Sequence, residues 1–350
     1  MVITEKKASL WRYCIPFKRQ GVVEPARFGD QGVTYRSGLV VELWQSGRQS
    51  LAEIAPLPGY SQESLTQATV QAKRQLSLWV QHQPMLFEHL YPSVAFGLSM
   101  ALHEGKQPYS RLHLGETARL IGSDELGYPQ EVQCQCGGLS TPCEASVARQ
   151  DHSVVGCAKI KLGRQRLVVD IERVKAALNH VSVLRIDVNR SWSLDDVMTF
   201  SHAFNPSQRE QIEWVEEPCT RLADSIQFAR QTGWPLALDE SLHGQKPSRQ
   251  SRWVSALVLK PTLIGSLERC RQWVDVANQH QQKWMLSSSL ESSLGLNQIA
   301  RLSEQWQAPA VAGLDTFDRF NHQVIRPWPL CEKPVLALEK LEKIWTSTVV

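Results

Sequence analysis

After about residue 130, short apolar segments alternate with amphipathic stretches, and this pattern constrains the fold more than any other feature. The amphipathic stretches, such as residues 166–181 and 220–234, predict helices. The apolar segments are rich in β-branched residues and predict buried strands at Val132–Cys136, Val154–Lys161, Val183–Asp187, Ile212–Glu216, Leu236–Asp239, Ala256–Lys260 and Trp284–Ser287. Strand and helix alternating roughly every 20–30 residues is typical of a parallel α/β fold. Seven or eight such units favour a closed barrel over an open sheet.

The residues before this alternation predict a separate α+β unit. A hairpin is expected from strands at Gly38–Trp44 and Leu51–Ala55, joined by a turn at Ser46-Gly47. A helix should follow, with Ser61 as its N-cap and Glu63 in its first turn.

The chain is expected to divide into three segments. We expect residues 1–110 to form the α+β unit, which includes a second, mostly apolar helix at 91–104. Residues 111–320 are expected to form the barrel, and a polar stretch at 105–117 is the linker between the two. Residues 321–350 lack the strand and helix alternation, and we expect them to leave the barrel and pack against the N-terminal unit.

The overall charge and hydropathy exclude several classes of protein. Thirty-eight basic residues against 35 acidic ones leave a net charge of +3, which is too balanced for a nucleic-acid-binding surface. No apolar run approaches the roughly 18 residues that a membrane span needs. The N-terminus carries Lys6 and Lys7 with no apolar segment or cleavage site after them, so the expected location is the cytoplasm.

Eight cysteines in 350 residues are too few for a disulfide scaffold. Cys134, Cys136 and Cys143 form the one cluster, but a single residue between the first two does not match the common spacing of zinc ligands. We expect reduced, buried thiols there.

Acidic residues end three successive predicted strands: Asp187, Glu216 and Asp239. In a parallel barrel the carboxyl ends of the strands converge at one mouth, so these side chains should lie together. Three carboxylates repel one another unless a cation binds between them. Because all the ligands are oxygens, the pattern predicts Mg²⁺, with room left for substrate.

Lysines end the strands on either side of these carboxylates. Lys161 precedes them and Lys260 follows them, so the two amines should face each other across the mouth. A lysine serves as a general base when burial and neighbouring cations favour its neutral amine, and Lys159 and Mg²⁺ would both act in that direction on Lys161. A carboxylate substrate bound to Mg²⁺ could then lose its α-proton, because the metal stabilises the resulting enediolate.

Each of these residues also has an ordinary structural explanation. Asp187 and Asp239 could be helix N-caps, and Glu216-Glu217-Pro218 could begin a solvated loop. The lysines could lie at strand ends with their amines in solvent. The joint pattern favours the functional interpretation, because all six groups end consecutive strands.

At these residues the chain resembles the enolase superfamily, and within it the o-succinylbenzoate synthase family of the menaquinone pathway. The matching motifs run in order from about Tyr35 to Asp315 and are K-x-K in "KIKLG", D-x-N in "IDVNRSW", E-E-P in "VEEPC", D-E-S in "ALDESL", K-P-T in "VLKPTLIGS", "SSSLESSLGL", "AGLDT" and "EIAPLPGYSQESL". Two departures are the long segment at 114–153 and Ala52, where the family usually has glycine.

The resemblance implies a (β/α)₇β barrel, a modified TIM barrel with an α+β capping domain. It assigns Asp187, Glu216 and Asp239 to Mg²⁺, and it takes Glu216 rather than Glu217 because the family uses the first glutamate of its motif. It implies that Lys161 removes the α-proton and that Lys260 stabilises the dienolate. The implied reaction is a syn-dehydration of 2-succinyl-6-hydroxy-2,4-cyclohexadiene-1-carboxylate to 2-succinylbenzoate, so the partner is a small carboxylate.

The resemblance also suggests substrate contacts. These are Lys159, Arg185, Asn189, Ser287, Ser288 and Ser289. The serine run lies where a strand should pass into a helix, and it could bind the succinyl carboxylate, or Ser289 could simply cap that helix. Residues 55–61 of the cap are expected to close over the mouth.

Other functions remain open at this point. The same lysines and metal suit an N-acylamino acid racemase, a dipeptide epimerase or a cycloisomerase, and a fold does not separate these reactions. A Schiff-base enzyme using Lys260 as nucleophile, or a protein that only binds Mg²⁺, is also conceivable but leaves the carboxylates or the paired amines without a role.

Overall fold

The structure is a computed structural model of the chain, and it describes residues 5–18, 34–106, 117–121, 155–329 and 331–348. Its elements form two compact units. Unit 1 comprises Met1–Thr117 and Ala237–Val350, and unit 2 comprises Ala118–Leu236. The boundary therefore falls inside strand β8 (Leu236–Leu238). The three segments expected from the sequence divide the chain by composition rather than by contact, and they stay a prediction.

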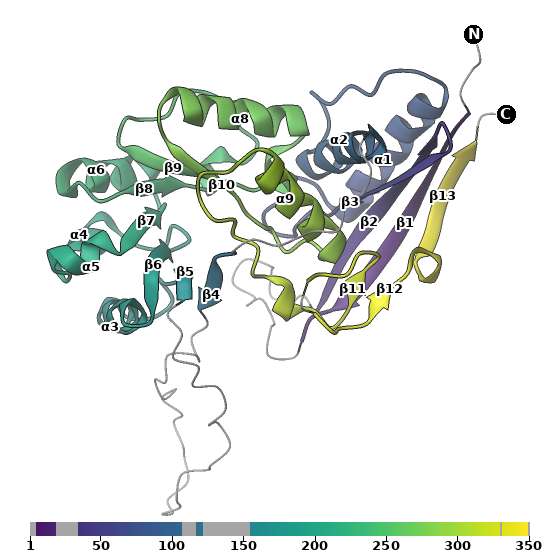
Figure 1. The fold of residues 1–350 in the computed structure, drawn as a ribbon. Helices are drawn as coiled ribbons and strands as arrows, with labels where there is room; N and C mark the ends of the chain where they lie inside the picture. Colours follow the sequence, from purple (N-terminus) through teal and green to yellow (C-terminus); the bar gives the residue numbers. More distant parts are fainter. Residues whose placement is uncertain (1–4, 19–33, 107–116, 122–154, 330, 349–350) are drawn as a thin grey trace, which may run out of the picture. The chain divides into compact units, whose positions relative to one another are not determined.

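Unit 1 contains a four-stranded antiparallel sheet in the order β13-β1-β2-β3. The strands are β1 (Lys6–Pro16), β2 (Tyr35–Gln45), β3 (Arg48–Ile54) and β13 (Glu342–Thr348). β1 and β13 come from opposite ends of the chain and lie side by side (Figure 1). The β2–β3 hairpin confirms the predicted turn, since Ser46 and Gly47 both have positive φ, as a tight two-residue turn requires.

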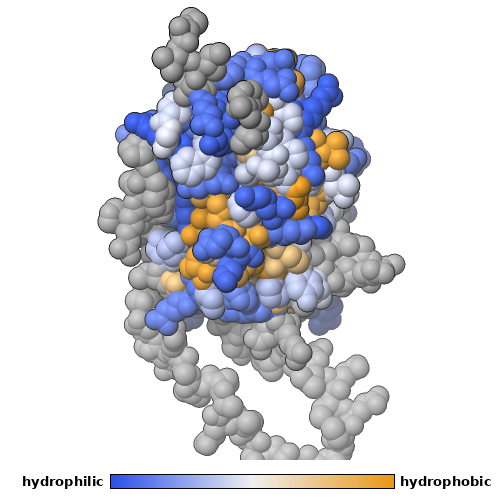
Figure 2. All heavy atoms as spheres, turned by 90° about the vertical axis from the view of Figure 1, so that its right-hand side faces the viewer, coloured by the Kyte–Doolittle hydropathy of each residue, from blue (hydrophilic) through white to orange (hydrophobic). Residues whose placement is uncertain are grey.

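Two helices cover one face of this sheet, α1 (Leu65–Val80) and α2 (Pro92–Lys106) (Figure 1). α2 approaches β3 so closely that a Cβ on Gly97 would lie 2.4 Å from the Ile54 side chain, so only glycine fits at this contact. Seen from the β13 side, the surface is largely hydrophilic around a central group of apolar side chains (Figure 2).

The expected start of the first helix is wrong by one turn. Ser64 is the N-cap of α1, and it forms a capping box with Gln67 that satisfies a backbone donor at each residue. Ser61 instead accepts a hydrogen bond from the Leu57 N–H, 2.8 Å away. Glu63 lies before the helix and accepts from the backbone N–H and hydroxyl of Ser93 at the start of α2. This long-range contact removes Glu63 from the predicted first turn.

Unit 2 carries parallel strands with helices between them. The strands are β4 (Arg119–Ile121), β5 (Val155–Lys161), β6 (Val181–Asp187) and β7 (Ile212–Glu216). The helices are α3 (Leu167–Leu178), α4 (Leu194–His202), α5 (Pro206–Glu210) and α6 (Leu222–Thr232). Ile160, Ile186 and Val215 belong to the core beneath these helices, where Phe200 and Trp234 pack edge to face.

The alternation continues in unit 1. In chain order its elements are β8, β9 (Val254–Leu259), α7 (Pro261–Ile264), α8 (Leu267–Gln279), β10 (Lys283–Leu286) and α9 (Ser293–Gln305). The strands form one sheet in the order β10-β9-β8-β7-β6-β5-β4. Two parallel bridges, Ser287 with Gly313 and Ala312 with Thr117, place residues 312–313 as a short eighth member after β10.

The remaining described elements are short. β11 (Gln323–Val324) and β12 (Val335–Leu336) pair in parallel, and 3₁₀ helices occur at Glu240–Leu242, Phe317–Arg319 and Leu338–Lys340. The six later predicted strands are confirmed to within a few residues. The first, at 132–136, lies outside the described residues, as does the cysteine cluster, and β4 is the first strand of the sheet described here. Within the described ranges, no helix combines the length and apolar character needed to cross a bilayer.

Candidate active site

The polar residues of unit 2 share one face of the sheet because side chains alternate along a strand. Parallel pairing aligns Lys161 with Asp187 and Asp187 with Glu216 at the carboxyl ends of β5, β6 and β7. Lys159 and Arg185 lie two residues earlier on the same face, whereas Ile160 and Ile186 point into the core. The strand pattern alone therefore brings five of the predicted site residues together.

Lys159 contacts both predicted metal-binding carboxylates of unit 2, Asp187 and Glu216. Its Nζ lies 2.9 Å from Asp187 Oδ2 and 2.5 Å from Glu216 Oε2. Both carboxylates are almost completely buried, so the ammonium compensates charges that would otherwise be costly to desolvate. Trp214 donates from its indole Nε1 to the other oxygen of Glu216, 3.2 Å away. One cation and one donor thus fix the orientation of Glu216.

Lys161 is held more loosely than Lys159. Its Nζ lies 3.7 Å from Asp187 Oδ2, and its side chain is 41% exposed, against 12% for Lys159. The chain turns at once after it, since Gly163 has a φ of +83° and donates its N–H to the buried Asp170, 2.7 Å away. Desolvation raises the pKa of Asp170.

The two glutamates of the E-E-P motif have different roles. Glu216 binds Lys159, whereas Glu217 turns away at a φ of +24° and pairs with Arg190, whose Nε lies 3.0 Å from its Oε2. Asn189 donates its backbone N–H to Asp187 Oδ1 at 3.0 Å.

Arg185, a predicted substrate contact, is only 1% exposed. Its Nε donates to Glu213 at 2.8 Å, and its guanidinium lies 4.3 Å from the centre of the Trp214 ring. In the described structure, Arg185 therefore braces Trp214, which in turn holds Glu216.

Asp239 and Lys260 form a second cluster, in unit 1. Lys260 donates to Asp239 Oδ2, and His243 Nε2 lies 3.2 Å from Oδ1 of the same carboxylate. Asp239 is completely buried and Lys260 is 13% exposed. Asp239 precedes a 3₁₀ helix but its carboxylate binds these two side chains instead of capping that helix. The alternative of a simple helix cap is therefore wrong for Asp239, and for Asp187, because Ser193 caps the helix that follows it.

The serine run follows β10 and is tied to a buried acid that the sequence did not single out. Glu291 accepts hydrogen bonds from the hydroxyls of Ser288, Ser289 and Thr262, at 2.6–2.8 Å. The Ser287 hydroxyl donates to the Gly313 carbonyl at 3.2 Å. Helix α9 begins later, with Ser292 as its N-cap, so the suggestion that Ser289 caps this helix is wrong.

The donor set fits a hard cation. Asp187 and Glu216 each direct one oxygen at the same ammonium group, so the two carboxylates already converge on a positive charge. Carboxylate oxygens are the ligands that Mg²⁺ prefers. Among the described residues, no group of three His, Cys, Asp or Glu side chains lies close enough to hold a metal as placed.

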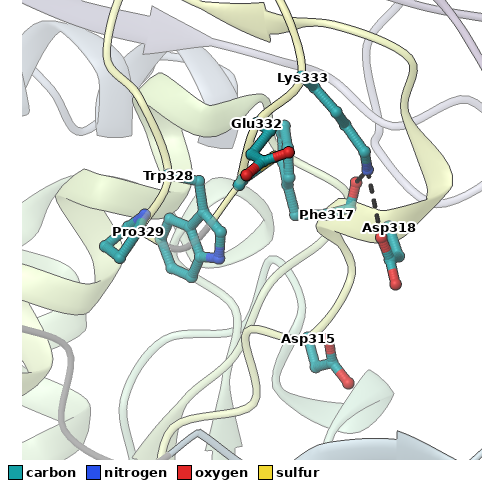
Figure 3. Close-up of a pocket in the computed structure, with 8 residues that line it drawn as sticks. Asp315, Phe317, Asp318, Trp328, Pro329, Glu332 and Lys333 are labelled. Atoms are coloured by element: carbon teal, nitrogen blue, oxygen red, sulfur yellow. Dashed lines mark hydrogen bonds and ion pairs between the residues drawn. The ribbon is translucent and has the colours of Figure 1, made fainter. Parts of the chain in front are cut away.

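Two other features lie apart from these clusters. Burial raises the pKa of the Cys219 thiol to about 11, so this thiol stays protonated and unreactive near neutral pH. A hollow of about 590 Å³ in unit 1 is lined by Asp315, Phe317, Asp318, Trp328, Pro329, Cys331, Glu332 and Lys333. Lys333 reaches across it to Asp318 and to the Phe317 carbonyl (Figure 3). None of the predicted site residues lines this hollow.

Comparisons with known families define the class of protein first. Residues 143–337 match the family described as "Enolase C-terminal domain-like", and residues 5–105 match "MenC, N-terminal domain". A solved o-succinylbenzoate synthase from Thermosynechococcus elongatus BP-1, complexed with Mg in its active site, superposes with a TM-score of 0.65 at 22% identity. It covers 93% of this chain and 96% of that one. The predicted enolase-type α/β fold is confirmed.

A curated relative then identifies the family. The o-succinylbenzoate synthase of Pasteurella multocida (strain Pm70) is 37% identical over an alignment of 348 residues that covers 95% of this chain and 96% of the relative. The chain belongs to the o-succinylbenzoate synthase family of the enolase superfamily, and its enzyme class is that of a hydro-lyase. The family and enzyme class expected from the motifs are confirmed. An N-succinyl Arg/Lys racemase from Bacillus cereus ATCC 14579 has the same fold, with a TM-score of 0.68 at 14% identity and coverage of 99% and 100%.

Proposed function

We propose that this protein catalyses the Mg²⁺-dependent syn-dehydration of 2-succinyl-6-hydroxy-2,4-cyclohexadiene-1-carboxylate to 2-succinylbenzoate. The single observation that carries the proposal is the ordered set of lysines and carboxylates at consecutive strand ends, in a chain 37% identical to a synthase of this name. Loss of water makes the ring aromatic, which supplies the thermodynamic drive.

Asp187, Glu216 and Asp239 would hold the metal. Their strands, β6, β7 and β8, are consecutive in the sheet order, and each carboxylate lies at or just after the carboxyl end of its strand. A bound Mg²⁺ supplies positive charge that stabilises the negative charge developing on the substrate carboxylate. The ammonium of Lys159 keeps Asp187 and Glu216 converged.

Lys161 would be the base. As a neutral amine it takes the α-proton, and the electrons of the broken C–H bond pass to the substrate carboxylate, which becomes an enediolate. These electrons then return to form the third double bond of the ring as the C–O bond breaks. The lysine ammonium gives its proton to the departing hydroxyl, which leaves as water. The exposure of Lys161 supports this assignment, because a base needs access to substrate whereas Lys159 is occupied by two carboxylates.

Lys260 would stabilise the enediolate by its positive charge. Its contact with buried Asp239 supports a fixed charge rather than a mobile base. Asn189 and the serine run would contact substrate. Arg185 would act indirectly, through Trp214 and Glu216, rather than by the direct contact expected from the sequence.

The deciding experiment is a turnover assay with the cyclohexadiene substrate. We expect aromatic product absorbance to appear with Mg²⁺, to disappear with EDTA and to return when Mg²⁺ is restored. Product formation at full rate in metal-free protein, or none with Mg²⁺, would refute the proposal.

A second reaction is worth testing because a racemase shares the fold as closely as a synthase does. If this chain racemises N-succinylamino acids, incubation in D₂O exchanges their α-hydrogen for deuterium. We expect dehydration to exceed this exchange by a wide margin, and the reverse order would assign the chain to racemisation.

A further inference from the structure

Arg36 of β2 is a buried arginine in unit 1, and its contacts lie outside the catalytic clusters. It is 2% exposed. Its Nε donates to the Leu290 carbonyl, its Nη1 to the Pro56 carbonyl and its Nη2 to the Ala55 carbonyl, each at 2.7 Å. One guanidinium therefore joins the cap loop (residues 55–62) to the serine loop (residues 287–292), although these segments lie more than 200 residues apart in sequence.

The backbone of the serine loop is strained where Arg36 binds it. Leu290 has a φ of +62°, a conformation that residues other than glycine rarely adopt. Its carbonyl accepts from Arg36 and its N–H donates to the Ser288 hydroxyl at 3.0 Å. A strained residue held at both polar ends marks a conformation that the surroundings enforce.

The strained residue is connected to the catalytic side of unit 1. Next to it, Glu291 binds Ser288 and Ser289, and it also binds Thr262, two residues after Lys260. Any shift of Leu290 would therefore move the serine hydroxyls relative to the strand end that carries Lys260.

The cap loop is in turn packed against the segment that follows Asp239. A Cβ on Gly244 would lie 2.2 Å from the side-chain amide nitrogen Nε2 of Gln62, so the end of the Gln62 side chain lies against the Gly244 backbone. The cap loop forms a turn that two hydrogen bonds close. The Ser61 N–H donates to the Leu57 carbonyl, and the Ser61 hydroxyl oxygen accepts from the Leu57 N–H. Arg36 holds the base of this turn.

We propose that Arg36 is a positioning residue that sets the spacing between the cap loop and the serine loop, and through it the affinity for the part of the substrate farthest from the metal. This inference rests on the proposed function. The three carbonyls accept from three different nitrogens of the rigid, planar guanidinium, whereas a lysine ammonium carries all its donors on one nitrogen and cannot reach the same three positions.

The test compares Arg36→Lys with a matched control, Arg326→Lys. Arg326 is also buried, and both of its terminal nitrogens donate to a different residue, Glu104 of α2. For Arg36→Lys we expect KM for the cyclohexadiene substrate to rise about tenfold while kcat changes less than about threefold, because a carbonyl left unpaired lets the loops separate. For Arg326→Lys we expect a lower Tm and an unchanged KM.

Hydrogen exchange provides a readout that does not depend on turnover. In Arg36→Lys, the peptides covering residues 55–62 and 287–292 should both exchange faster than in the wild type. In Arg326→Lys, both peptides should exchange at the wild-type rate. Equal KM and equal exchange in the two variants would overturn the inference. If wild-type protein shows no turnover, the proposed function fails, and the paired exchange result still decides whether Arg36 couples the loops.

The second substitution Leu290→Gly keeps the test decisive if Arg36→Lys does not fold. Glycine adopts positive φ without strain, so Leu290→Gly should restore folding or lower the KM of the Arg36→Lys protein. A double variant that behaves no better than Arg36→Lys would show that Arg36 serves stability alone.

Discussion

The two lysines assigned to the chemistry lie in contrasting surroundings. Lys161 is 41% exposed, and its amine lies 3.7 Å from Asp187, which a second lysine already neutralises. Lys260 is 13% exposed and binds a completely buried Asp239, which His243 also contacts. In the proposed function these different surroundings would serve different tasks. Lys161, beside an already neutralised carboxylate, would give and take the proton, and Lys260, paired with Asp239, would supply charge.

A buried carboxylate supports the chain after each lysine. Asp170 accepts from Gly163, two residues after Lys161, and Glu291 accepts from Thr262, two residues after Lys260. The two supports differ in strength, because Glu291 accepts four hydrogen bonds and anchors the serine loop as well.

Removing the base should have the largest effect. Lys161→Ala is expected to lower kcat about 10³- to 10⁴-fold, because it removes the group that both takes and returns the proton. Product absorbance measures the rate. Calorimetric titration with Mg²⁺ is the control, since metal binding should survive the change. Activity near that of the wild type would break the proposed distinction between the lysines.

Lys260→Ala should be slower by about 10²- to 10³-fold, since only charge stabilisation is lost. The informative measurement is exchange of the substrate α-hydrogen in D₂O, which should continue in this variant because Lys161 remains. If Lys260→Ala abolishes exchange as completely as Lys161→Ala does, both lysines act as bases and the contrast between them is wrong.

Asp187→Asn should weaken Mg²⁺ binding at least about 10- to 100-fold. A loss of this size is typical even when the mutated residue only hydrogen-bonds to a metal ligand. Titration calorimetry gives the Kd directly. Glu217→Gln is the matched control, because Glu217 pairs with Arg190 instead. Equal losses in the two variants would show that the E-E-P motif is assigned to the wrong glutamate.

Glu291→Gln should destabilise the protein by about 2 kcal/mol, because an amide accepts at one oxygen only and leaves hydroxyl donors of the serine loop without an acceptor. Chemical denaturation gives the free energy of unfolding. A change below the experimental error would mean that the serine loop does not depend on this carboxylate.

Asp170→Asn should have the smallest effect, about 1 kcal/mol. Since burial raises the pKa of Asp170, the folded state binds its proton more tightly than the unfolded chain does. The carboxyl therefore contributes most to stability below its unfolded pKa, and the contribution declines as the pH rises through the raised value. Unfolding measured on both sides of that range should show the difference between wild type and variant shrinking with rising pH. A difference that grows would contradict the assignment.

Much of the fold was predictable because its signals are local. The β2–β3 hairpin could be predicted from the Ser46-Gly47 turn and the strands on either side of it. Six strands of the parallel sheet could be predicted from their apolar segments, because shifting a strand by one residue would move its apolar side chains to the other face. The start of α1 was misplaced although its signal was present. Ser64 and Gln67 have the spacing of a capping box, and this reciprocal pair outweighs the earlier Ser61.

The sequence by itself determined the order of strands and the residues at their ends, because side-chain alternation and parallel pairing leave little choice about which groups share a face. Only the tertiary structure decided the partners. Lys159 joins Asp187 and Glu216, Glu217 turns to Arg190, and Arg36 joins two distant loops. These contacts depend on long-range packing and on the need to pair every buried charge, and no local pattern in the chain encodes them.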